Sequence, residues 1–114
     1  MAHRRPMTFD AAVRQALDSL PPQIAAGMRN IAVVVEDENP EDPDLYGLFD
    51  GVPRTELGDD AGLLPGKITI YRLPLREDFP DDDDLVREIR VTVLHEVGHY
   101  FGLDEDRLAE LGYE

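Results

Sequence analysis

Residues 85–101 read LVREIRVTVLHEVGHYF, a run of 17 residues without proline. Successive residues of an α-helix lie about 100° apart around its axis, so such a run divides into two faces. The half of the helix opposite His95 is apolar: Val86, Ile89, Val93, Val97 and Tyr100. The stretch therefore predicts an amphipathic helix with one face in the core and a polar face that carries His95.

Four aspartates, Asp81–Asp84, stand just before this run. A helix N-terminus favours negative charge and a side-chain cap, so we interpret them as the start of the helix. Calcium or magnesium binding is the weaker interpretation, because contiguous carboxylates on one turn do not converge on one ion. Gly102 is placed to end the helix, and a further helical segment is predicted from Asp104 to Leu111.

The polar face carries an H-E-x-x-H motif, His95-Glu96-Val97-Gly98-His99. Histidines four residues apart lie about 40° apart around a helix and one turn apart along it, so both imidazoles can bind one metal ion. Glu96 projects to the side, where its carboxylate can reach a water without taking a coordination position. We therefore predict His95 and His99 as metal ligands and Glu96 as a general base.

A third protein ligand is expected, because catalytic zinc usually has three. The chain has no cysteine, its third histidine is His3 near the N-terminus, and only 15 residues follow His99. A carboxylate of this tail is the expected ligand. Glu105 stands where the extended motif H-E-x-x-H-x-x-G-x-x-H places a histidine, with Asp104 and Asp106 as alternatives. Such a set suits zinc and could also hold iron, manganese or nickel.

Two further residues share the histidine face, Glu88 and Thr92. Metal-bound imidazoles usually donate their second N–H to an acceptor, so these residues are candidate partners. Gly98 lies inside the predicted helix at a cost near 1 kcal/mol, which suggests a close approach of backbone or substrate. Tyr100 and Tyr113 are weaker candidates for stabilising an oxyanion, since both are more typical of packing residues.

Toward the N-terminus, periodicity predicts two helical segments and one strand. Thr8 can cap a helix over Phe9–Leu20, and a helical turn is expected at Gln23–Met28. The β-branched run Ile31–Val35 predicts a buried strand, and the acidic, proline-containing Glu36–Pro43 predicts a loop.

The middle of the chain predicts further strands. Leu45–Phe49 and Arg54–Leu57, separated by an Asp-Gly turn signal, predict a hairpin at a sheet edge that could bind extended substrate. Lys67–Arg72 alternates polar and apolar residues, which is the clearest strand pattern in the chain. Loops are expected at Gly58–Gly66 and Leu73–Pro80.

Length and charge bound the possible functions. The chain has 114 residues, of which 42% are hydrophobic, enough for one core, so we predict a single domain over residues 1–114. A formal charge of −14 repels phosphate backbones and anionic lipid, which disfavours nucleic-acid and membrane partners. No apolar run is long enough to span a membrane and no signal peptide is visible, so the cytoplasm is the expected location.

The sequence resembles the small bacterial zincin-like metallopeptidases, minimal zincins with matrix-metalloprotease-like motifs. The segments that carry the resemblance cover nearly the whole chain: Phe9–Leu20 followed by Pro21, Ile31–Asp37, Gly47–Pro53, Ile68–Tyr71, Arg90–Glu96 and Arg107–Tyr113. The resemblance implies an α+β fold in which a small mixed sheet packs against an N-terminal helix and the helix that carries H-E-x-x-H. It also implies that His95, His99 and an acidic residue hold Zn²⁺ while Glu96 acts as base.

Two function hypotheses follow. The first is a zinc-dependent metallopeptidase that hydrolyses peptide bonds of a peptide or unfolded protein substrate with a metal-activated water. The second is a metal-binding or protein-interaction module that keeps the fold without proteolysis. The second stays open because the sequence has no methionine after His99 and lacks the large C-terminal lobe of bigger proteases. The intact Glu96 favours the first, since a structural metal site does not need it.

Overall fold

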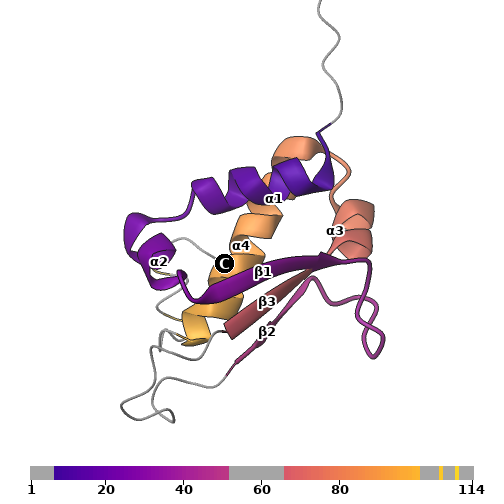
Figure 1. The fold of residues 1–114 in the computed structure, drawn as a ribbon. Helices are drawn as coiled ribbons and strands as arrows, with labels where there is room; N and C mark the ends of the chain where they lie inside the picture. The colour runs from indigo at the N-terminus through magenta and orange to yellow at the C-terminus, as the bar shows by residue number, and fades with distance from the viewer. Residues whose placement is uncertain (1–6, 52–65, 101–105, 107–109, 111–114) are drawn as a thin grey trace, which may run out of the picture.

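The computed structural model describes residues 7–51 and 66–100, together with Asp106 and Glu110. It has an α+β fold, as the sequence predicts (Figure 1). In chain order the described elements are α1 (Phe9–Asp18), α2 (Pro22–Gly27), β1 (Ile31–Glu36), β2 (Gly47–Asp50), β3 (Gly66–Tyr71), α3 (Arg72–Asp78) and α4 (Asp82–Tyr100). None of the described helices is both long enough and apolar enough to cross a membrane.

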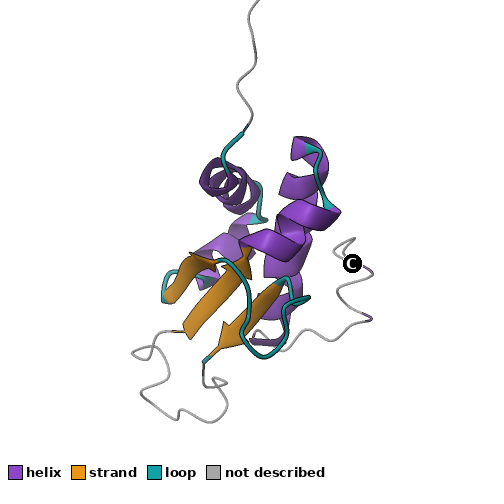
Figure 2. Cartoon of the chain, turned by 90° about the vertical axis from the view of Figure 1, so that its right-hand side faces the viewer, coloured by secondary structure: helices purple, strands orange, loops and turns teal. Residues whose placement is uncertain are grey.

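The sheet is small and mixed, with strand order β1-β3-β2 among the described strands. β3 pairs with β1 in parallel and with β2 in antiparallel orientation. Ile68 and Ile70 on the central strand β3 are fully buried, as the apolar positions of its alternation predict, and the intervening Thr69 is buried as well. β2 lies at an edge of this sheet, beside the C-terminal half of α4 (Figures 1 and 2).

The core lies between the sheet and helices α1 and α4, which cover one of its faces (Figure 2). The expected apolar face of α4 is confirmed at Ile89, Val93 and Val97, all fully buried. The buried face is wider than the prediction, because Leu85 and Leu94 are also buried. α4 is therefore fixed along its length, and its remaining face is free to carry polar groups.

Both predicted helix caps are present. The Thr8 hydroxyl accepts the N–H of Ala11 at 3.1 Å, at the start of α1. The Asp81 carboxylate accepts the N–H groups of Asp83 and Asp84 at 3.0 and 3.1 Å, at the start of α4. The first aspartate of the run therefore acts as a cap, and the next three place negative charge at the helix N-terminus.

The expected loop at Leu73–Pro80 is wrong, because Arg72–Asp78 forms helix α3. Pro74 occupies the third helical position, where the backbone needs no N–H donor, so it does not break the helix. Leu75 is fully buried and anchors the helix to the core. The predicted strand Lys67–Arg72 is accordingly shifted by one residue and runs from Gly66 to Tyr71.

Arg76 links α3 to the beginning of α4 and to the chain before α1. Its guanidinium donates to Asp82 at 3.1 Å and to the Met7 carbonyl oxygen at 2.9 Å. Asp82 in turn accepts the N–H of Met7 at 3.3 Å. Three separate segments therefore meet at one partly exposed polar cluster.

The predicted hairpin needs a correction in its first arm. The arm predicted at Leu45–Phe49 is observed as strand Gly47–Asp50, and its described partner is β3, with Gly47 opposite Ile70 and Phe49 opposite Ile68. This pairing places β2 against a strand whose Ile68 and Ile70 are fully buried. The second arm, Arg54–Leu57, lies outside the described residues.

Candidate active site

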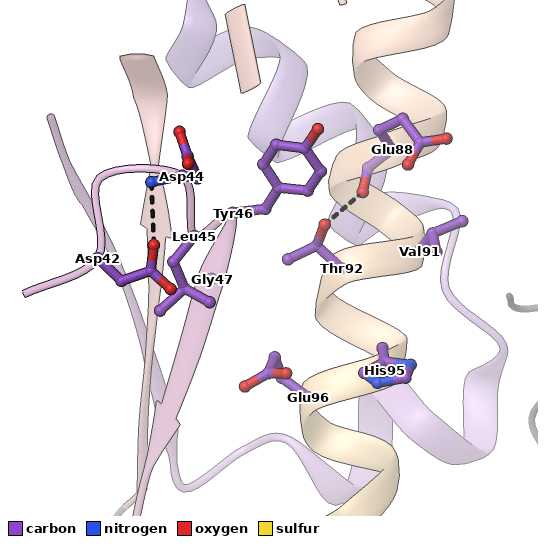
Figure 3. Close-up of a pocket in the computed structure, with 10 residues that line it drawn as sticks. All are labelled: Asp42, Asp44, Leu45, Tyr46, Gly47, Glu88, Val91, Thr92, His95 and Glu96. Carbon is purple, nitrogen blue, oxygen red and sulfur yellow. Dashed lines mark hydrogen bonds between the residues drawn. The ribbon is translucent and has the colours of Figure 1, made fainter. Parts of the chain in front are cut away.

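A groove of about 440 Å³ lies between α4 and the segment that enters β2 (Figure 3). One wall is a stripe of α4, and the other is the chain from the preceding loop into the strand. The described residues that line it are Glu88, Val91, Thr92, His95 and Glu96 from α4, and Asp42, Asp44, Leu45, Tyr46 and Gly47 from the opposite wall.

Glu96, the predicted general base, is half-buried at the β2 side of this groove. Its side chain extends from α4 toward the sheet (Figure 3). One carboxylate oxygen, Oε1, accepts the backbone N–H of Phe49 at 3.0 Å. The edge strand therefore holds the carboxylate, and the hydrogen bond joins residues 47 positions apart in the chain.

The direction of this N–H follows from the pairing of β2. The Tyr71 N–H donates to the Tyr46 carbonyl oxygen at 2.9 Å, so residue 46 directs its backbone groups toward β3. Backbone direction alternates along a strand of an antiparallel pair, so Gly47 and Phe49 direct their N–H and C=O groups away from β3. The Phe49 N–H therefore reaches Glu96 on α4, and Gly47 lines the groove.

Gly47 lets the strand approach the helix closely. A Cβ atom at this position would lie 2.7 Å from Cγ2 of Thr92 and 3.2 Å from the carbonyl oxygen of Thr69. The first distance is well inside van der Waals contact, so a side chain would separate the two walls. A glycine inside a strand commonly marks such an approach.

Tyr46 forms the upper part of the groove wall in Figure 3. Its hydroxyl donates to the carboxylate of Asp78, and its ring packs edge-on against Phe79 with centroids 5.7 Å apart. The hydrogen bond to Asp78, burial, and the negative charges of Asp78, Glu88 and Asp44 raise the pKa of Tyr46 to about 12. The tyrosine therefore stays neutral and oriented at physiological pH.

The groove is electrostatically negative. Four of its described lining residues are acidic, Asp42, Asp44, Glu88 and Glu96, and none of the described lining residues is a lysine or arginine. Low-dielectric walls concentrate such a field, which favours cations and disfavours anions.

The structure places one predicted histidine ligand at the groove. His95 is half-buried and lies next to Glu96 on the wall formed by α4. His99 belongs to the last turn of α4, one helical turn further on, although its side chain lies outside the described part. Glu105 and Asp104 are also outside that part, and Asp106 is exposed.

No three His, Asp or Glu side chains come together as a metal site among the residues that the structure describes. The donor set can still be judged by its chemistry. Two imidazole nitrogens spaced one turn apart on one helix, with a carboxylate from the following segment, are ligands that Zn²⁺ accepts. The predicted set of His95, His99 and Glu105 therefore fits zinc, and the identity of the third ligand stays a prediction.

The predicted partners of the imidazoles lie on the groove wall. The Thr92 hydroxyl donates to the backbone oxygen of Glu88 at 2.7 Å, a bond within the helix. Support of an imidazole by Thr92 or Glu88 remains a prediction. Gly98 is buried. Tyr113 is outside the described residues, as is the side chain of Tyr100.

Sequence reasoning did not identify three structural features of the opposite wall: Gly47, the N–H of Phe49 and the ring of Tyr46. The glycine inside an expected strand was a signal for a close backbone approach. The other two features had no local signal, because they depend on which helix the edge strand meets.

Comparison with known proteins supports the resemblance. A family model described as zincin-like metallopeptidase matches residues 28–113. A comparison with curated proteins finds no match. The family match covers most of the chain, including all three described strands and α4. The chain therefore belongs to the zincin-like metallopeptidase family.

Proposed function

We propose that this protein is a zinc-dependent peptidase in which Glu96 is the general base. The observation that carries the proposal is the position of Glu96, which lies beside His95 on the wall of a groove that runs along a sheet edge. A carboxylate that only stabilised the fold would not need a place beside a metal-ligand candidate at the edge of a substrate-sized groove. The family match supports the same reaction class.

His95, His99 and Glu105 would hold the zinc ion. A bound zinc ion supplies Lewis-acid activation, lowering the pKa of water from about 15.7 to about 7 and polarising a peptide carbonyl. The protein's own contribution is to fix the donors on a rigid helix, since α4 is buried along one face.

Glu96 would take a proton from the attacking water and pass it to the leaving amine. General acid–base catalysis of this kind contributes about 100- to 10,000-fold to the rate. The carboxylate would be ready for this step because the Phe49 N–H already orients it at 3.0 Å. Oε1 accepts that N–H, and Oε2 is the oxygen that would receive the proton.

An extended peptide would bind along the outer edge of β2. Gly47 lines the groove and directs its N–H and C=O away from β3, so it can pair with a substrate backbone. The acidic walls would favour a substrate with basic side chains, although this preference would weaken with salt. Unfolded proteins present such extended segments most readily.

The test compares wild type with Glu96→Gln, a substitution that keeps size and hydrogen bonding while removing the base. Both proteins are reconstituted with zinc, their metal content is measured by elemental analysis, and hydrolysis of an unfolded protein substrate is followed. We expect about one zinc per chain in both proteins and cleavage by wild type alone, reduced at least about 100-fold in the variant.

Zinc near one equivalent without cleavage above the variant would reject the peptidase and leave the non-proteolytic module. Absence of bound zinc at neutral pH would reject both metal-dependent functions. We also propose the cytoplasm as the site of this activity, because the chain has no cysteine and its folding needs no oxidising compartment. Fractionation of the source cells would test the location.

A further inference from the structure

We infer that Gly47 is a positioning residue for Glu96: by allowing strand β2 to lie against α4, it brings the Phe49 N–H to the carboxylate. The catalytic part of this inference rests on the proposed function. The geometric part does not, because the hydrogen bond and the close contact are properties of the fold.

Strand β2 and helix α4 are in close contact at Gly47. The Cβ of any other residue at position 47 would lie 2.7 Å from Cγ2 of Thr92. The carbonyl oxygen of Thr69, on the neighbouring strand, would lie 3.2 Å away on another side. The strand therefore has no free space in which to take up a side chain while keeping its distance from α4.

The Thr92 side chain cannot easily turn away from Gly47. Its hydroxyl donates to the Glu88 backbone oxygen at 2.7 Å, which fixes its χ1 angle. Thr92 is also buried, at 9% exposure, so rotation would bring its groups against packed neighbours. With χ1 fixed, Cγ2 stays directed at Gly47, and the clash must be relieved by movement of β2.

The position of β2 determines how Glu96 is held, because the Phe49 N–H of this strand donates to the Glu96 carboxylate. Phe49 is two residues beyond Gly47 and has the same backbone direction, so both face α4. Movement of β2 away from the helix would lengthen the 3.0 Å bond from the Phe49 N–H to Glu96. The glutamate side chain would then sample several rotamers in place of one orientation. A displacement of about 1 Å at a catalytic group can cost on the order of 100-fold in rate.

The first experiment measures the hydrogen bond directly in the metal-free protein. The exchange rate of the Phe49 amide hydrogen is followed by NMR in wild type and in Glu96→Ala. We expect exchange in the variant to be about ten- to a hundred-fold faster, as for loss of a hydrogen bond to a charged group. An unchanged rate would overturn the inference, whatever the protein's activity.

The second experiment uses Gly47→Ala with a rescue. Thr92→Ser keeps the hydroxyl but lacks Cγ2, so the double variant Gly47→Ala/Thr92→Ser removes the 2.7 Å contact. Gly47→Ala alone should speed Phe49 exchange about tenfold or more and lower kcat/KM about 10- to 100-fold. The double variant should return to within about threefold of Thr92→Ser in both measurements. Failure of this rescue would overturn the inference.

A matched control separates positioning from general destabilisation. Val13→Ala removes core volume in α1, outside the groove, and should lower the melting temperature without changing Phe49 exchange or kcat/KM. If Gly47→Ala does not fold, the Glu96→Ala exchange rate still decides the inference. If zinc-loaded wild type does not cleave peptides, the proposed function fails while the exchange measurements remain decisive for the positioning role.

Discussion

The hydrogen bond between Tyr46 and Asp78 holds one wall of the groove, and replacing Tyr46 with phenylalanine removes it while keeping the ring. Interactions that raise the pKa of Tyr46 from about 10 to about 12 stabilise the neutral form by at most about 2.7 kcal/mol. The pair is in contact with solvent, so screening reduces this value. We expect Tyr46→Phe to lower the free energy of unfolding by about 1 kcal/mol at neutral pH.

This contribution should depend on pH in a defined direction. The folded-state pKa of Tyr46 is raised, so the stabilisation is fully present below about pH 10, the unfolded value. Between about pH 10 and pH 12 the unfolded state loses its phenol proton first, and the stabilisation declines as pH rises. The difference between wild type and Tyr46→Phe should therefore shrink over this interval.

The assay is urea unfolding of both proteins at neutral pH and at about pH 11, combined with an ultraviolet titration of the phenolate. Asp78→Asn and the double variant complete a thermodynamic cycle, with an expected coupling of about 1 kcal/mol at neutral pH. A coupling near zero would refute the hydrogen-bond assignment. An unchanged stability difference at about pH 11, or a phenolate transition near pH 10 in Tyr46, would refute the pKa reasoning.

Asp81→Ala should destabilise the protein by about 1 kcal/mol, because two N–H groups at the start of α4 lose their acceptor. An unchanged urea midpoint of unfolding would contradict the capping role. Arg76→Ala should also lower the free energy of unfolding by about 1 kcal/mol, since the side chains of its ion pair with Asp82 are partly exposed, at 32% and 39%. A loss of stability above about 3 kcal/mol would contradict this value and would be typical of a buried ion pair. Glu105→Ala should weaken zinc affinity at least about tenfold in a chelator competition. An affinity equal to that of wild type would move the third ligand to Asp104 or Asp106.

The helices with strong periodicity could be predicted because their signals are local. A cap followed by apolar residues at three- and four-residue spacing identifies α1 and α4 without knowledge of their partners. Helix α3 was missed because its short segment was expected to be a loop. Proline is tolerated in the first turn of a helix, and the burial of Leu75 that stabilises this helix has no local signal.

The same distinction between local and non-local signals applies to the candidate site. His95 and Glu96 could be predicted because one motif on one helix places them together. The opposite wall could not, since the pairing of β2 with β3 is non-local and an expected hairpin competed with it. The contact of Gly47 with Thr92 joins positions 45 residues apart, and only the packed fold determines it.

Part of the chain's excess of acidic residues lies around the groove. The negative charges of Asp78, Glu88 and Asp44 add to the hydrogen bond from Tyr46 to Asp78 and to burial, which together raise the pKa of Tyr46. The same negative charges would attract a divalent cation at His95 and a basic peptide beside it, because both carry positive charge. A cation bound in the groove would oppose only the charge contribution to the raised pKa of Tyr46, while the hydrogen bond to Asp78 and burial would remain. Under the proposed function, the field that favours metal loading would also favour a basic substrate, and each bound cation would weaken the attraction for the next.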